Sequence, residues 1–167
     1  MTEIRSRIFK RTNIISVLLI ASIFLIDRLS KIEIIKHILD KNSSIYVNDY
    51  LNLDLVWNTG IGFGLFDLDG GIPYHLISLV IFLVILGLIF FMIKSPLESE
   101  KLLYSVILGG ALGNFYDRVF YFAVPDFIDI HFNDFHWFTF NIADIFISLG
   151  IILFILKELI FVTNEKN

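Results

Sequence analysis

Long runs of apolar residues dominate the chain, and short polar segments separate them. No Lys, Arg, Asp or Glu occurs over the 24 residues from Gly70 to Ile93. A helix of that length can cross about 30 Å of hydrocarbon. Three further apolar runs carry a few polar interruptions. The pattern predicts an α-helical membrane protein with four transmembrane helices, at approximately 14–35, 72–93, 102–124 and 138–156.

Two segments between these runs alternate apolar and polar residues. Leu51, Leu53 and Leu55 are separated by single polar residues, and 128–133 has the same pattern. A period of two is typical of a half-buried strand. We therefore expect a small β-sheet and outer loops beside the four helices.

Composition supports a chain that is partly solvated by lipid. Of the 167 residues, 56% are apolar and 18% are charged, and the mean hydropathy is +0.77. Soluble domains contain roughly 45–50% apolar and about 25% charged residues. The length fits one integral-membrane domain over 1–167. The chain has no cysteine and a net charge of −4, which excludes thiol chemistry and argues against a nucleic-acid partner.

The basic residues predict how the helices are oriented. Lys and Arg gather in the N-terminal tail, at 94–101 and in the C-terminal tail, whereas the connections 37–73 and 121–137 contain only Lys41. The positive-inside rule then places both termini in the cytoplasm and the two connections on the outer face. The first apolar run meets Asp27 and Arg28 instead of a cleavage site, so we expect it to stay uncleaved. An interfacial aromatic belt is expected from Trp57, Phe63, Phe66, Phe135 and Trp137.

Several polar residues within the predicted spans need an explanation, since each ionisable group near mid-bilayer costs about 2.5–3.5 kcal/mol. Asp27 and Lys31 are four residues apart and can form an ion pair on one helical face, for which we favour a structural role. Asn114 and Asp117 share a face, whereas Arg118 must find its acid on another element. A satisfied buried network and a functional polar site are equally compatible with these residues.

Small residues mark one face of the third predicted span. Gly109 and Gly113 form a GxxxG pattern, which indicates close helix packing more readily than chemistry.

Two aspartates are predicted to meet at the outer interface. Pro125 ends the third span just before Asp126, and Asp144 is expected about two turns inside the fourth span. Because these spans are antiparallel neighbours, the two carboxyl groups can approach each other. Repulsion and desolvation would then leave one carboxyl ionised and the other protonated.

Such a pair can hydrolyse a peptide bond. The ionised member takes a proton from water as it attacks the carbonyl, and the protonated member donates a proton. Four nearby polar residues can bind an extended substrate backbone, steady the pair or be structural: Asn58, Asn114, Arg118 and Asn141.

Other catalytic patterns are missing from the sequence. It contains no HExxH and no GxSxG motif. The four histidines show no ligand spacing, and we expect His131 and His136 to be interfacial hydrogen-bonding groups rather than metal ligands. We therefore expect no metal and no cofactor.

Five motifs in register carry a resemblance to a known family. They are DRLSK at 27–31, WNTGIGFG at 57–64, GGALGNFYDRV at 109–119, VPDFID at 124–129 and FNIAD at 140–144. In this order and spacing they resemble the lipoprotein signal peptidase (signal peptidase II) family of bacteria. The chain departs from the family pattern in TGIGFG and at Pro125, both in predicted substrate-facing loops.

The resemblance implies an intramembrane aspartyl endopeptidase. Such enzymes remove signal peptides from diacylglyceryl-modified prolipoproteins, cutting on the N-terminal side of the lipid-modified cysteine. The family's catalytic pair falls on Asp126 and Asp144. Its supporting positions fall on Asn58, Gly110, Asn114, Asp117, Arg118, Asn141, Asp27 and Lys31. Its fold, four helices with a small outer sheet cradling the substrate, agrees with the alternation described above.

The expected setting is the bacterial cytoplasmic membrane, with the active site near the outer face. The expected partners are lipid-modified prolipoproteins and membrane lipids, and we expect a monomer. One alternative is a proton-coupled small membrane carrier with a relay through Asp27, Asp117 and Asp144. Four spans without a repeat are few for a carrier. A purely structural membrane partner would leave the many outer-face aspartates unexplained.

Overall fold

The computed structural model describes residues 11–60, 71–133 and 135–164. Its helices are α2 (Arg11–Lys41), α3 (Gly71–Lys94), α4 (Glu98–Phe120) and α5 (Ile142–Asn164). Its strands are β1 (Ile45–Asn48), β2 (Leu51–Asn58), β3 (Val124–Phe132) and β4 (Phe135–Phe140). Phe63 and Phe66 of the predicted aromatic belt and residues 61–64 of the 57–64 motif lie outside the described residues, as does most of the basic N-terminal tail.

Helix α4 is the centre of the helical part and packs against α2, α3 and α5. The GxxxG pattern faces α2, because a Cβ atom at Gly109 would lie 2.7 Å from the Cβ of Ile23. Gly113 likewise lies against the side chain of Asp27. Close helix packing, as the sequence predicts, therefore brings the polar residues of α2 and α4 together.

The helices turn much of their apolar surface outward. Helix α3 buries only Tyr74 and Ile85. Among the described helices, α2 and α3 are long and apolar enough to cross a membrane. Helix α5 also exposes apolar side chains along its length, including Leu149, Leu156 and Phe161. Lipid is the solvent that suits such a surface.

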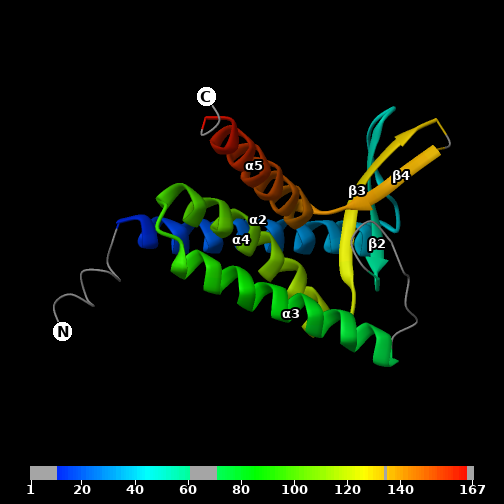
Figure 1. The fold of residues 1–167 in the computed structure, drawn as a ribbon. Helices are drawn as coiled ribbons and strands as arrows, with labels where there is room; N and C mark the ends of the chain where they lie inside the picture. Colours follow the sequence, from blue (N-terminus) through cyan, green and yellow to red (C-terminus); the bar gives the residue numbers. More distant parts are fainter. Residues whose placement is uncertain (1–10, 61–70, 134, 165–167) are drawn as a thin grey trace.

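The strands form one antiparallel sheet in the order β1-β2-β3-β4. Leu53 lies opposite Ile128, and Ile130 lies opposite Phe138. The two strands that alternation predicts are thus the central pair. Figure 1 shows the sheet at the end of the helices opposite the α3–α4 turn and the end of α5. The exposed aromatic side chains of Trp57, Phe135 and Trp137 lie on this sheet.

The sheet shifts two of the predicted helix boundaries, and α2 and α5 extend past their predicted ends at 35 and 156 to Lys41 and Asn164. The third helix ends at Phe120 instead of 124, since Val124 begins β3 and pairs with β2. The fourth begins at Ile142 instead of 138, because Phe135–Phe140 pairs with β3. Asp144 therefore lies in the first turn of α5 rather than two turns inside it.

Candidate active site

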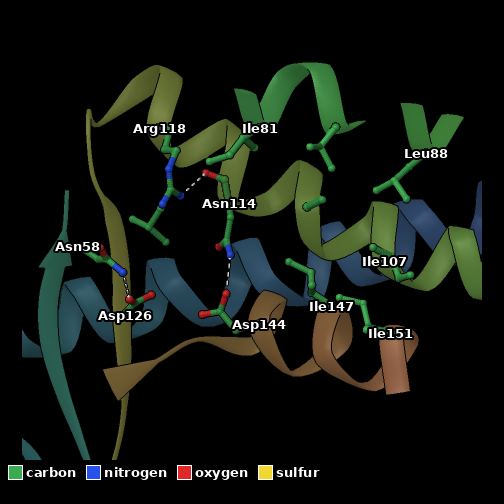
Figure 2. A pocket seen from close by; sticks show the side chains of 13 residues that line it. Asn58, Ile81, Leu88, Ile107, Asn114, Arg118, Asp126, Asp144, Ile147 and Ile151 are labelled. Atoms are coloured by element: carbon green, nitrogen blue, oxygen red, sulfur yellow. Dashed lines mark hydrogen bonds between the residues drawn. The ribbon is translucent and has the colours of Figure 1, made fainter. Parts of the chain in front are cut away.

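A cavity of about 320 Å³ lies among α3, α4 and α5 at the point where β2 and β3 approach them. One end is polar and the other is apolar, as Figure 2 shows. The polar lining comprises Asn58, Asn114, Arg118, Asp126 and Asp144. The apolar lining comprises Ile81, Val84, Leu88, Ile107, Ala111, Val124, Ile147 and Ile151.

Asp126 is held in this cavity by two neutral amides. It lies on β3 and is 2% exposed. Its Oδ2 accepts a hydrogen bond from Asn58 Nδ2 at 2.8 Å, and its Oδ1 accepts one from Asn141 Nδ2 at 2.6 Å. Burial, with repulsion from the nearby Asp144 carboxylate, raises the pKa of Asp126 to about 6. This carboxyl group can therefore hold a proton near neutral pH.

Asp144 is positioned by the start of α5. Asn141 precedes the helix, and its Oδ1 accepts a hydrogen bond from the Asp144 backbone N–H at 3.2 Å. In return, Asp144 Oδ2 accepts one from the Asn141 backbone N–H at 3.1 Å. This reciprocal arrangement is a capping box, with an Asn-x-x-Asp sequence. Because Asn141 also donates to Asp126, one fully buried residue fixes both acids.

The third amide at the site is Asn114 of α4. Its Nδ2 donates to Asp144 Oδ1 at 2.8 Å, and its Oδ1 accepts from Lys31 Nζ at 2.9 Å. The lysine ammonium thereby fixes which end of the amide faces Asp144. Among the described residues, every hydrogen-bond donor to the Asp126 and Asp144 carboxylates is an uncharged amide or backbone group.

Arg118 does not have the acidic partner that the sequence predicts. Its guanidinium donates to the carbonyl oxygens of Gly60 at 2.7 Å and Asn114 at 3.5 Å. Among the described residues it forms no ion pair within 4.0 Å. A guanidinium can satisfy its fixed N–H groups with backbone carbonyls. Arg118 therefore fastens the end of β2 to α4 beside the cavity.

A second polar cluster joins α2 to α4 behind the cavity. Lys31 Nζ lies 2.8 Å from Asp27 Oδ2 and 2.7 Å from Asp117 Oδ2, and all three side chains are fully buried. The predicted pair of Asp27 and Lys31 is confirmed. Asp27 Oδ1 also accepts from the backbone N–H of Ala143 at 3.0 Å, which ties the cluster to the start of α5.

Arg28 belongs to this cluster and is missed by the sequence reasoning. Its guanidinium forms an ion pair with Asp117 and lies over the rings of Tyr116 at 5.0 Å and Tyr121 at 5.5 Å. The available signal was the repeated Asp-Arg dipeptide, at 27–28 on α2 and at 117–118 on α4. Only one of the two arginines pairs with an acid.

Gly110 lets α5 approach α4 beside the cavity. A Cβ atom at this position would lie 2.5 Å from the carbonyl oxygen of Ala143, closer than Cβ atoms come to other atoms in real structures. Because Ala143 immediately precedes Asp144, a larger residue at 110 would displace that aspartate. The packing at Gly110 thus sets the position of one of the two acids.

The comparisons with known proteins agree with one another. A family model described as signal peptidase (SPase) II matches residues 19–160. The lipoprotein signal peptidase of Pelagibacter ubique (strain HTCC1062) is 47% identical over 157 residues, covering 92% of this chain and 94% of that protein. That of Anaplasma phagocytophilum (strain HZ) is 39% identical over 150 residues, with coverages of 89% and 94%.

The fold is also similar to a solved structure. That structure is described as a bacterial membrane enzyme determined by the in meso method at 2.3 Å resolution. The TM-score is 0.74 with 28% sequence identity, and the similarity covers 89% of this chain and 90% of the solved one.

Proposed function

The chain belongs to the signal peptidase II family, and we therefore propose that Asp126 and Asp144 catalyse cleavage of lipoprotein signal peptides. Family membership makes the chain a peptidase. The observation that carries the aspartyl mechanism is the shared cavity, in which two carboxyl groups have neutral donors only. Two such groups are more stable when they share one proton than when both are ionised.

The proposed reaction is a direct attack by water. The ionised carboxylate accepts a proton from water as the water oxygen bonds to the carbon of the scissile carbonyl. The protonated carboxyl donates its proton to the carbonyl oxygen, which yields a neutral tetrahedral intermediate. As the C–N bond breaks, the carboxyl group that took its proton from water donates it to the amide nitrogen, and the other carboxylate accepts a hydroxyl proton from the intermediate. The products are a signal peptide with a new carboxyl end and a lipoprotein with a new amino end.

The two ends of the cavity suggest how the substrate lies. The apolar end suits the hydrophobic part of a signal peptide and the acyl chains of a diacylglyceryl-modified cysteine, which keep the substrate in the bilayer. The polar end meets the backbone at the cleavage site, on the N-terminal side of that cysteine. Asn58, Asn114, Asn141 and Arg118 hold the acids and the surrounding elements in place. Asp27, Lys31, Asp117 and Gly110 fix α2, α4 and α5 behind them.

The proposed setting follows from the same surfaces. All four helices cross the cytoplasmic membrane of a bacterium, with both termini in the cytoplasm and the sheet at the outer face. Outward-facing apolar side chains on α2, α3 and α5 support this arrangement. Prolipoproteins and membrane lipids are the proposed partners, and the chain acts as a monomer without a cofactor in the reaction.

Near-isosteric replacement of each acid tests the proposal. Purified Asp126→Asn and Asp144→Asn enzymes should process a lipidated preprotein at least about 10³-fold more slowly than wild type, because each loses a proton-transfer group. The matched control is Asp54→Asn, since Asp54 is exposed on β2 and should process normally. Processing by either active-site variant at the wild-type rate would refute the proposal.

A proton-coupled carrier predicts a different result with the same variants. Asp27, Lys31, Asn114 and Asp144 form a continuous chain of contacts that a proton relay would require. Proton flux into proteoliposomes would then fall in Asp144→Asn, while processing of the preprotein would be unchanged.

A further inference from the structure

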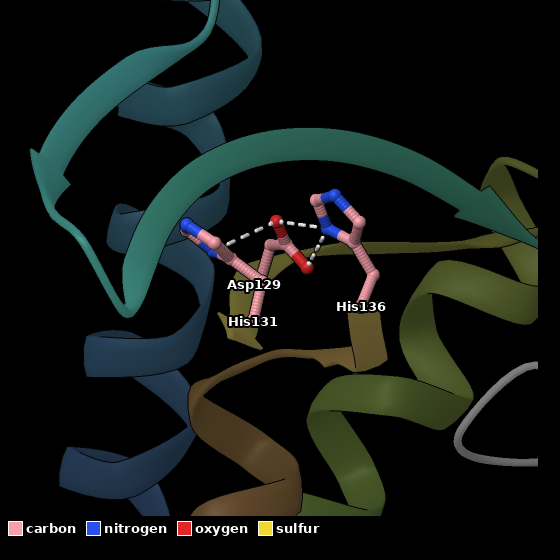
Figure 3. Close-up of side chains that lie close together, drawn as sticks. All are labelled: Asp129, His131 and His136. Atoms are coloured by element: carbon pink, nitrogen blue, oxygen red, sulfur yellow. Dashed lines mark hydrogen bonds and ion pairs between the residues drawn. The ribbon is translucent and has the colours of Figure 1, made fainter. Parts of the chain in front are cut away.

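A second group of titratable side chains lies on the β3–β4 hairpin. Asp129, His131 and His136 each offer a ligand atom, and these atoms lie within 4.8 Å of one another. Figure 3 shows the two imidazole rings on either side of the carboxylate. None of the three residues lines the cavity of the candidate active site. The cluster therefore needs an explanation of its own.

The pairing of the two strands creates the cluster. Asp129 and His131 are two residues apart on β3, so their side chains point to the same face of the sheet. His136 lies directly opposite His131 on β4, and cross-strand partners also share a face. The sequence predicts hydrogen-bonding groups here, which the contact of His136 with Asp129 confirms. The separation of these histidines along the sequence shows no ligand pattern, and the hairpin register alone brings them together.

One carboxylate oxygen and two ring nitrogens lie close enough to bind a single ion. Asp129 Oδ2 lies 2.8 Å from His136 Nδ1 and 3.5 Å from His131 Nδ1. Ligand bonds of about 2.0–2.1 Å in a tetrahedral zinc site separate neighbouring ligand atoms by roughly 3.3 Å. The two measured separations lie on either side of that value. Small side-chain rotations are therefore enough to accommodate an ion.

Two buried polar atoms at the cluster lack a hydrogen-bond partner among the described residues. One is Nδ1 of His131, whose side chain is only 10% exposed. The other is Oδ1 of Asn52, which lies opposite Asp129 on β2. Buried polar atoms normally have a partner, and both of these atoms can donate a lone pair. The side chain of His136 is 58% exposed, so an ion can enter from solvent.

We propose that Asp129, His131 and His136 bind a divalent transition-metal ion of the zinc class. Imidazole together with carboxylate suits Zn²⁺, whereas Mg²⁺ and Ca²⁺ prefer oxygen ligands alone. Three protein ligands leave a fourth position for water or the Asn52 oxygen. The ion cross-links β3 to β4. Asp126 lies on β3 and Asn141 directly follows β4, so the ion stiffens the hairpin that presents both residues to the active site.

Zinc titration of the full chain tests this site. The protein is purified in detergent without a polyhistidine tag, stripped with a chelator and titrated with ZnCl₂ by calorimetry. Wild type should bind one Zn²⁺ per chain, and His131→Ala and His136→Ala should each weaken binding by at least about 10-fold. His75→Ala is the matched control and should bind as wild type does. Saturating Zn²⁺ should also raise the thermal unfolding temperature of wild type.

The site is refuted if wild type shows no saturable zinc binding, or if the His131 and His136 variants bind as tightly as wild type. His136→Gln keeps the test valid if the His131 variant fails to fold, because the His136 side chain is largely exposed. Zinc binding is measured without substrate. Its outcome is therefore independent of whether Asp126 and Asp144 are catalytic.

Discussion

The protein contains two pairs of buried aspartates, and the two pairs have different hydrogen-bond and ion-pair partners. Asp27 and Asp117 share the ammonium of Lys31, and Arg28 adds a second positive charge. Asp126 and Asp144 receive hydrogen bonds only from amides and a backbone N–H among the described residues. A pair of carboxylates that shares a buried cation holds the helices that carry them together. A carboxylate with neutral partners in an apolar cavity can take up and release a proton.

The two pairs are nevertheless connected. Asn114 accepts from Lys31 and donates to Asp144, and Asp27 accepts from the backbone of Ala143 beside Asp144. The charged cluster thus orients the groups around the reactive pair without placing a cation against it. Asn114 separates the Lys31 ammonium from Asp144, and the cation that lines the cavity, Arg118, donates to backbone carbonyl oxygens.

Removing the shared cation should have the largest effect on folding. Lys31→Met leaves the buried Asp27 and Asp117 carboxylates without their common partner, which should cost about 3–5 kcal/mol of stability. Thermal unfolding in detergent micelles measures the change. Lys36→Met on the same helix is the control, because Lys36 is exposed. Equal stability of the two variants would show that the cluster does not hold α2 to α4.

A cation placed beside Asp126 should make the Asp126–Asp144 pair resemble the ion-paired Asp27 and Asp117. Asn58→Lys places an ammonium beside Asp126, which lowers the pKa of that carboxyl group and keeps it ionised. We expect kcat/KM for a lipidated preprotein to fall about 100-fold, and thermal unfolding in detergent checks that the variant is folded. Val47→Lys adds the same charge at an exposed position of β1, which does not pair with β3, and should leave activity intact. Wild-type activity in Asn58→Lys would contradict the requirement for neutral partners.

Replacement of Asn114, which connects Lys31 to Asp144, should have a smaller effect on activity. Asn114→Ala removes the donor to Asp144 and frees Lys31 from its amide contact. Loss of a positioning hydrogen bond of about 1–2 kcal/mol corresponds to a decrease in kcat of roughly 10-fold. The KM should not change, since Asn114 acts through Asp144. A change confined to KM would instead assign Asn114 to substrate binding.

The sequence predicts the helices and the central strands because long apolar runs indicate the helices and a period of two indicates the strands. It misplaces the start of α5, because the apolar residues of Phe135–Phe140 are compatible with either a helix or a strand. Only pairing with β3 decides between the two. The other edge strand, β1, is four residues long and offers too little pattern to predict.

The candidate active site can be predicted from the sequence to about the same extent as the fold. Asp126 and Asp144 were identified from Pro125, from the order of the spans and from the family resemblance. The partner of Asp117 was missed, since the rotation of α2 about its axis determines that Arg28 faces α4. The capping role of Asn141 was available in the Asn-x-x-Asp spacing. Its second bond, to Asp126, depends on how β3 returns past the start of α5.

The pH dependence of cleavage shows whether Asp126 and Asp144 share one proton during catalysis. Below about pH 6 Asp126 carries a proton, and above it the group ionises. If the pair works with one shared proton, a fully protonated pair lacks a base and a fully ionised pair lacks an acid. The account predicts a bell-shaped profile of kcat/KM with one limb near pH 6. A rate that is constant between about pH 4 and pH 9 would contradict acid–base catalysis by these two aspartates.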